Sequence, residues 1–320
     1  MIRTPLCELL GIEHPILQGG MAWIATPELA AAVSNAGGLG IVGAGNAPPD
    51  VIRRDLRRAR ELTGRPFGAN VPLFTAGAAE AIQVFIDEGV AVVTTGGGNA
   101  GPFLEPLQRA GIRVIPVVAS VALARRMARL GVDALIAEGM ESGGHIGDVA
   151  TLPLVPQVVD AVDVPVIAAG GFADGRGLAA ALALGAVGVQ MGTRFICTAE
   201  SQAHPNYKRR LLEAHDRATV VTGHSLGHPV RSLRGQFARR FEELERAGAS
   251  EAEVLAFGAG SLRAAVVEGD AERGTMMAGQ SAGLVRDVVP VQVLIQRLVA
   301  EAEAAIRRSA AQIVNGRDGT

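Results

Sequence analysis

Aromatic residues are scarce in this 320-residue chain, at 3% of the sequence, with one tryptophan and one tyrosine. The 30 lysine and arginine residues nearly balance the 32 aspartate and glutamate residues, so the formal net charge is only −2. A nucleic-acid-binding protein usually carries a basic surface or aromatic platforms on which bases stack. The composition therefore argues against nucleic acid as a partner.

Cysteines and long apolar runs are scarce as well. The two cysteines, Cys7 and Cys197, fit no metal or redox spacing, and this low number is typical of a reducing compartment. No apolar run approaches the roughly 18 residues that a membrane helix requires. The N-terminal sequence also lacks the apolar core of a signal peptide. We therefore expect a cytoplasmic protein without a membrane partner.

Glycine and short apolar segments, in contrast, are abundant: the chain has 41 glycines and is 48% hydrophobic. Before residue 200, eight short apolar segments alternate with segments of helical composition, such as 154–162. This alternation predicts parallel strands with crossover helices, and eight units predict a closed (β/α)8 TIM barrel. An open doubly wound sheet would favour a GxGxxG turn after the first strand, where this chain has QGGMAW. The expected strands are residues 15–18, 39–42, 67–71, 90–95, 113–118, 134–137, 164–169 and 187–191.

The sequence changes character after the eighth expected strand. Residues 204–250 are polar and contain four of the six histidines. We expect residues 201–254 to form a small cap over the mouth of the barrel. The barrel would then comprise residues 1–200 and 255–320, with a final helix over 290–309 and a frayed end after residue 314.

Two small-residue turns follow the last two expected barrel strands. Gly170-Gly171 ends one strand and Gly192-Thr193 ends the next. Backbone N–H groups in such turns can close around an anion, because no side chain blocks the approach. The loops after strands seven and eight of a TIM barrel are a frequent phosphate site. Either turn alone would be unremarkable, but together they predict a phosphate-binding cradle.

His145 is the best candidate for proton transfer. It follows Gly143-Gly144 in a loop after an expected strand, where a TIM barrel carries its functional residues. A lone loop histidine is more often structural, but this position favours a catalytic role, and an imidazole can exchange a proton near neutral pH. His224 and His228 have the spacing of zinc ligands, but their segment is a poor helix and no third ligand is near. We expect no metal site.

Several motifs resemble those of one enzyme family. They are QGGMAWIATPELAAAVSNAGGLGIVGAGNAP, AEGMESGGHIG, PVIAAGGFADGRG, QMGTRF and GTMMAGQSAGL, which occur in this order over about residues 1–285. As a set they resemble the flavin-dependent enoyl-(acyl-carrier-protein) reductase II family and the similar nitronate monooxygenases, also called 2-nitropropane dioxygenases. The resemblance implies a TIM barrel that binds FMN. It also implies that a hydride passes from NADH or NADPH, through FMN, to a trans-2-enoyl thioester.

The resemblance also implies roles for individual residues. His145 matches the active-site histidine of both families. Contacts with FMN would come from three groups of residues. The flavin ring and ribityl chain would contact Gly19, Gly20, Met21 and Asn70, with Glu138 and Gly143 beside the ring. The phosphate would be held by Gly170, Gly171, Gln190, Met191, Gly192 and Thr193, and residues 276–280, including Met277, would close over the cofactor edge.

Two features favour the reductase over the nitronate monooxygenase, which remains the alternative. Glu138 stands where nitronate enzymes usually have glutamine, and the segment GHPVRSLRGQF is similar to the reductases. Ser142 departs from the alanine that is usual in both. A reductase of this kind would act in fatty acid synthesis on an enoyl group carried by acyl carrier protein. A monovalent cation involving Glu138 and a homodimer are left open by the resemblance.

Overall fold

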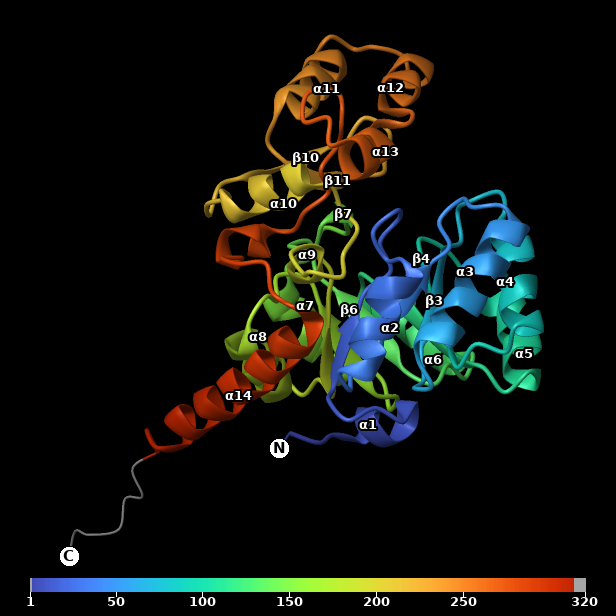
Figure 1. Cartoon of the computed structure of the whole chain (residues 1–320), viewed down its shortest axis with the longest axis vertical. Coiled ribbons are helices and arrows are strands. Elements are labelled where there is room, and N and C mark those ends of the chain that lie inside the picture. Colours follow the sequence, from blue (N-terminus) through green and yellow to red (C-terminus); the bar gives the residue numbers. More distant parts are fainter. Residues whose placement is uncertain (1, 314–320) are drawn as a thin grey trace, which may run out of the picture.

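A computed structural model of the chain, describing residues 2–313, contains a barrel of parallel strands (Figure 1). Within the described residues, eight strands are hydrogen-bonded in the order β1-β9-β8-β6-β5-β4-β3-β2. A bridge between Leu17 and Leu39 joins the two ends of this sheet and closes the barrel. The expected TIM barrel is thereby confirmed. Its strands are β1 (Ile16–Gln18), β2 (Ile41–Gly43), β3 (Gly68–Pro72), β4 (Val92–Gly96), β5 (Arg113–Val118), β6 (Leu135–Glu138), β8 (Val166–Ala169) and β9 (Gly188–Met191).

Helices surround this barrel and begin at local capping residues. The side chains of Thr26, Ser120 and Asp174 each accept a hydrogen bond from a backbone N–H of the first turn that follows. Each such cap stabilises its helix by about 1 kcal/mol. The surrounding helices are α2 (Pro27–Asn35), α3 (Pro49–Leu62), α4 (Ala78–Asp87), α5 (Gly101–Arg109), α6 (Val121–Arg129), α7 (Thr151–Val159) and α8 (Gly175–Ala183). The short α9 (Thr193–Ile196) follows β9, and the long α14 (Val291–Ala310) lies along α8 (Figure 1).

The inside of the barrel is a packed apolar core rather than a channel. Leu17, Ile115 and Ile167, on three different strands, are fully buried in one cluster. Leu6 and Leu10 of α1 (Pro5–Leu10) belong to the same cluster. Helix α1, which the sequence analysis did not predict, therefore plugs the end of the barrel opposite the cap (Figure 1).

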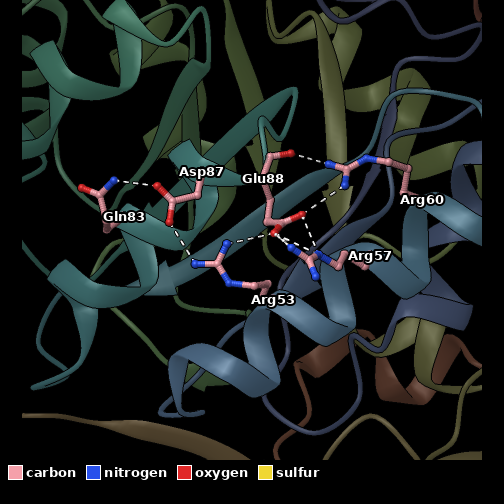
Figure 2. A network of polar contacts seen from close by, with 6 residues as sticks. All are labelled: Arg53, Arg57, Arg60, Gln83, Asp87 and Glu88. Carbon is pink, nitrogen blue, oxygen red and sulfur yellow. Dashed lines mark hydrogen bonds and ion pairs between the residues drawn. The ribbon is translucent and has the colours of Figure 1, made fainter.

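An ion-pair network ties α3 to α4 on the outside of the barrel (Figure 2). The side chain of Glu88, immediately after α4, is only 6% exposed and lies within 3.3 Å of guanidinium groups from Arg53, Arg57 and Arg60. Arg53 also pairs with Asp87 at 2.9 Å. The hydrogen bond from Arg57, followed by those from Arg53 and Arg60, holds the pKa of Glu88 below its usual range. The buried carboxylate thus stays ionised and fixes the two helices together.

A second layer covers the carboxyl ends of the barrel strands. It contains a three-stranded antiparallel sheet in the order β10-β11-β7. Strand β7 (Gly144–His145) belongs to the loop after β6, so the barrel itself supplies the third strand. The other elements are α10 (Pro205–Leu212), β10 (Thr219–Thr222), β11 (Val230–Leu233), α11 (Gln236–Arg246), α12 (Glu251–Gly258) and α13 (Ser261–Arg263). A π-helical turn (Ala264–Glu268) and a 3-10 turn (Gln280–Leu284) lead back to the barrel.

The division of the chain into barrel (1–200 and 255–320) and cap (201–254) stays a prediction. Phe257 stacks on Phe237 with ring centroids 4.9 Å apart, so α12 packs on α11 in the upper layer. The expected frayed end after residue 314 lies outside the described residues. Within the described part of the chain, no helix is both long and apolar enough to cross a membrane.

Candidate functional site

A cavity of about 1450 Å³ lies between the carboxyl ends of the barrel strands and the upper layer. Ligand pockets commonly enclose about 300–1000 Å³, so this one has room for more than one molecule. Met276, Ala278 and Gln280, which belong to the segment predicted to close over the cofactor edge, do not line the cavity. The candidate residues named individually in the sequence analysis all do. These residues are Gly19, Gly20, Met21, Asn70, Glu138, Gly143, His145, Gly170, Gly171, Gln190, Met191, Gly192, Thr193 and Met277.

The turn after β1 approaches β3 as closely as glycine allows. A Cβ atom on Gly20 would lie 2.4 Å from the Cβ of Asn70, which no side chain could accommodate. The amide nitrogen of Asn70 donates to the carbonyl and hydroxyl oxygens of Thr94, at 3.1 and 3.0 Å. These bonds orient the Asn70 side chain beside the Gly19-Gly20 backbone. The result is an amide-rich wall suited to a planar polar ligand.

Two glycine turns follow β8 and β9, and β9 pairs directly with β1. Gly170 and Gly171 have φ angles of 90° and 87°, a left-handed conformation that favours glycine. Within the described loops their N–H groups donate to no other residue. Thr193 Oγ1 accepts a hydrogen bond from the Gly279 N–H at 2.9 Å, which leaves the hydroxyl proton free to donate. The two turns therefore offer hydrogen-bond donors to an anion, as a phosphate cradle requires.

Glu141 connects this cradle to the loop that carries His145. Its carboxylate accepts a bond from the Thr151 N–H at 2.8 Å, at the start of α7. Thr151 Oγ1 lies 2.8 Å from the same carboxylate and 2.9 Å from the carbonyl oxygen of Gly170. The backbone oxygen of Glu141 accepts from Gln280 at 2.9 Å. The cradle, the histidine loop and the segment 277–280 thus form one hydrogen-bonded unit.

His145 faces the cavity from strand β7. Its ring is tilted against that of Phe74, with centroids 5.1 Å apart. Although its side chain is open to the cavity, the surrounding walls lower its pKa by desolvation, and His228 lowers it further by charge repulsion. The imidazole is therefore neutral at pH 7, and it can donate a hydrogen bond from one nitrogen and accept at the other.

Glu138, at the end of β6, is the other titratable candidate in the cavity. Burial raises the pKa of its carboxyl from 4.5 to about 7, and the nearby hydroxyl of Ser142 opposes this rise. Ser142 is 8% exposed, and its Oγ makes no hydrogen bond of normal geometry. The Ser142 hydroxyl thus lies near the Glu138 carboxyl without a well-formed bond to it, and it lines the cavity where a ligand could bond to it.

The structure adds residues that the sequence analysis did not single out. The additional lining residues include Trp23, Phe74, Phe172, Tyr207 and Arg263. One signal was visible in the sequence, because the single tryptophan directly follows the QGGMA turn. Arg263 gave no such signal, since α13 brings it to the cavity through tertiary packing alone. Within residues 2–313, no three histidine, cysteine or acidic side chains gather as metal ligands would.

The described site fits FMN in its chemistry. The cradle offers donors for one phosphate, the Gly20 and Asn70 wall offers amide groups for a planar ring, and the Ser142 hydroxyl has no well-formed hydrogen bond. Glycine is required at Gly20 because any side chain would fill the space between the turn and β3. The residues present are thus compatible with a flavin mononucleotide.

Comparison with known proteins identifies the class to which this fold and site belong. A family model described as nitronate monooxygenase matches residues 3–301, and the chain belongs to that family. Its structure is similar to that of FabK, an enoyl-(acyl-carrier-protein) reductase II, from Thermotoga maritima. The two are 52% identical with a TM-score of 0.96, over 98% of this chain and 100% of the other.

Two further relatives carry other names. A nitroalkane oxidase from Streptomyces ansochromogenes is 34% identical, with a TM-score of 0.85 over 96% of this chain and 99% of the other. A (3aS,4S,5R,7aS)-5-hydroxy-7a-methyl-1-oxo-octahydro-1H-indene-4-carboxyl-CoA dehydrogenase from Mycobacterium tuberculosis is 37% identical, over 98% of this chain and 99% of the other. These relatives are oxidoreductases, and the chain is an oxidoreductase of a flavin-dependent family.

Proposed function

We propose that this protein is an FMN-dependent enoyl-(acyl-carrier-protein) reductase that uses NADH or NADPH in fatty acid synthesis. The similarity to FabK over the whole chain is the observation that carries this proposal. The gathering of the individually predicted contact residues around one cavity supports it. A cytoplasmic location, a monovalent cation near Glu138 and a homodimer remain predictions from the sequence.

In this proposal, each wall of the cavity has a separate task. Gly170, Gly171, Gly192 and Thr193 bind the phosphate of FMN through backbone N–H groups and the threonine hydroxyl. Gln190 and Met191 also belong to the phosphate side. The ring and ribityl chain are held by Gly19, Gly20, Met21, Asn70, Glu138 and Gly143, and Met277 closes over the cofactor edge. When bound, FMN supplies the hydride chemistry that no side chain of the protein can supply.

His145 acts on the substrate. As the thioester is reduced, negative charge develops on its carbonyl oxygen and the α-carbon takes up a proton. The neutral imidazole of His145 donates a hydrogen bond to that oxygen or delivers the proton, directly or through water. General acid catalysis of this kind contributes typically about 10²–10⁴-fold to the rate.

Nitronate monooxygenase is the second candidate, because the family model and the nitroalkane oxidase point to it. Glu138 favours the reductase, since nitronate enzymes usually carry glutamine there. The CoA dehydrogenase relative raises a further question, which is whether the acyl carrier is a protein or CoA.

The first experiment identifies the cofactor. The purified protein should be yellow and release FMN, rather than FAD, on denaturation, because the cradle has donors for one phosphate group. Chromatography of the released flavin decides this. Recovery of FAD, or a colourless protein that FMN cannot reconstitute, would contradict the proposal.

The second experiment separates the candidate reactions. The oxidised protein is mixed with NADH without oxygen, and the flavin absorbance is followed in a stopped-flow instrument. Rapid bleaching, followed by reoxidation with an enoyl thioester, supports the reductase. Slow bleaching together with oxygen-dependent turnover of a nitronate would support the monooxygenase instead. Comparing the same enoyl group on acyl carrier protein and on CoA identifies the carrier.

The third experiment tests His145 directly. His145→Ala should keep FMN and much of the NADH-dependent bleaching, yet lose most of the reoxidation by enoyl thioester. His215→Ala is the matched control, because His215 is an exposed histidine of the upper layer that does not line the cavity. Equal losses in both half-reactions would make His145 a positioning residue. An unchanged enoyl step would remove it from the mechanism.

A further inference from the structure

Trp23 and Arg263 both line the cavity, and neither is among the proposed FMN contacts. Trp23 lies in the loop between β1 and α2, and Arg263 ends α13. The Arg263 guanidinium carbon lies 6.0 Å from the centroid of the Trp23 ring, and both side chains line the cavity. Two distant segments thus place a cation and an aromatic face together.

The conformation of Trp23 is unusual and is not explained by packing. Its φ angle is 66°, and it is the one non-glycine residue in the described part of the chain with a positive φ. The left-handed conformation is strained for a bulky residue, and such outliers cluster at ligand-binding positions. Burial of the side chain offsets little of this strain, because Trp23 is 55% exposed. The backbone strain at Trp23 therefore keeps the single tryptophan in a position that a ligand can reach.

The segment that carries Arg263 is also irregular. It leads into the π-helical turn Ala264–Glu268, a rare conformation that is frequent at functional sites. Arg263 pairs with Glu268 of this turn, and both side chains are about half exposed, at 53% and 45%. An exposed ion pair of this kind contributes little to stability. Arg263 can therefore exchange Glu268 for an anionic ligand at small cost.

We propose that Trp23 and Arg263 form a subsite for the adenosine diphosphate moiety that NAD(P)H and CoA share, an inference that rests on the proposed function. An indole face stacks on an adenine ring, and a guanidinium binds a phosphate through two parallel hydrogen bonds. No other side-chain pair on the described cavity lining combines an exposed tryptophan with a cation.

The surrounding charges and the available space fit such a ligand. Arg54 and Arg58 of α3 line the same cavity, and each is held by carboxylates at the surface, including Asp55 and Glu28. These pairs keep the cavity mouth close to neutral, so recognition depends on the stacked ring and on Arg263 rather than on a general positive field. The volume of about 1450 Å³ leaves room for a nucleotide beside FMN.

The fluorescence of Trp23 provides a direct test, because it is the only tryptophan in the chain. The FMN-loaded protein is titrated with ADP, which carries the proposed moiety and cannot reduce the flavin. ADP should change the tryptophan emission saturably. Arg263→Gln should weaken the ADP affinity by about tenfold or more, since a charged hydrogen bond to phosphate is lost. The matched control is Arg273→Gln, because Arg273 is also an exposed arginine paired with a carboxylate, but lies outside the cavity lining.

A second variant, Trp23→Leu, is assayed by equilibrium dialysis of ADP, with the flavin absorbance spectrum as the check on folding. Loss of stacking should weaken ADP binding by roughly fivefold or more. Competition of ADP by NAD⁺ or by CoA identifies the source of the moiety, and either result supports the subsite. No response to ADP, an equal effect of the Arg263 and Arg273 changes, or competition by phosphopantetheine without its nucleotide would overturn it.

This readout is independent of the proposed reaction. If NADH fails to bleach the flavin but ADP still binds through Trp23 and Arg263, the reductase proposal fails and the subsite stands. If bleaching is rapid but ADP does not bind there, the subsite alone is wrong.

Discussion

Replacing Gly170 with alanine should destabilise the fold more than the same change at Gly171, although the two residues are neighbours with similar backbone angles. A Cβ on Gly170 would lie 2.7 Å from the carbonyl oxygen of Gly139 and 3.0 Å from Thr151 Oγ1. The nearest atom to a Cβ on Gly171 is the Cβ of Glu141, at an ordinary contact distance of 3.4 Å. The first substitution collides with backbone, whereas the second is open on the side of the cavity.

Because of these distances, we expect different losses in the free energy of unfolding for the two alanine variants. Each alanine would occupy a left-handed conformation, at a cost of about 1–2 kcal/mol. Gly170→Ala adds an overpacking penalty of about 1–3 kcal/mol, because the Gly139 carbonyl must move. We therefore expect a loss of about 2–5 kcal/mol at Gly170 and about 1–2 kcal/mol at Gly171.

The assay is denaturant unfolding of the cofactor-free protein, paired with FMN titration of each variant. In Gly171→Ala, the loss of FMN binding free energy should exceed the loss in the free energy of unfolding of the cofactor-free protein. Gly171→Asp should abolish FMN binding while leaving a folded barrel, because it places a negative charge against the phosphate. Equal destabilisation by the two alanines would refute the packing argument. Near-native FMN affinity in Gly171→Asp would refute the position of the cradle.

Three further predictions concern buried polar groups. Because the folded pKa of Glu138 is about 7 against an ordinary 4.5, wild-type stability should fall as pH rises between these values. Glu138→Gln should remove that fall. The difference in free energy of unfolding between the variant and the wild type should therefore be up to about 3 kcal/mol more favourable to the variant above pH 7 than below pH 4.5, as measured by denaturant unfolding at both pH values. Tyr207→Phe should lose about 1–3 kcal/mol, because the buried hydroxyl donates to Met277 O at 2.5 Å; a neutral effect on the unfolding midpoint would contradict this. Arg194 is 4% exposed and pairs with Asp287 at 2.6 Å, so Asp287→Asn, which leaves the buried guanidinium without its carboxylate, should lower the thermal midpoint. Arg194→Met should lower it by less, because Asp287 is 37% exposed and keeps its ion pair with Arg297.

The barrel could be predicted from the sequence because its signals are local. Each strand is a short apolar run and each turn carries glycine, so every element can be recognised within a few residues. Helix α1 escaped notice since its six residues are too few to show a helical period. Helix α7 begins at Thr151, three residues before the expected start at 154, because Glu141 caps it from another loop. A cap of this kind depends on a tertiary contact, so the sequence next to the helix start does not indicate it.

In the candidate site, too, the features with local sequence signals could be predicted and those that depend on tertiary contacts could not. Its glycine turns and His145 lie in strand-end loops that the barrel topology brings together, and these were predictable. The pKa of Glu138 depends on burial by many residues, so the sequence could suggest the residue but not its protonation. The contact of Trp23 with Arg263 joins residues 240 positions apart, and no local pattern encodes it.

The pairing of β7 with β11 limits how the two layers of this protein can be exchanged between relatives. Val230 is in register with His145, and Arg231 with Gly144. The buried Arg231 side chain also donates from Nε to Met140 O at 3.0 Å, at the start of the same loop. A chimera that joined this barrel to a cap from another enzyme would have to preserve that register. A slip of one residue would turn the side chains of the graft to the opposite face of the sheet. Cap and histidine loop are therefore expected to be inherited, or transplanted, as one unit.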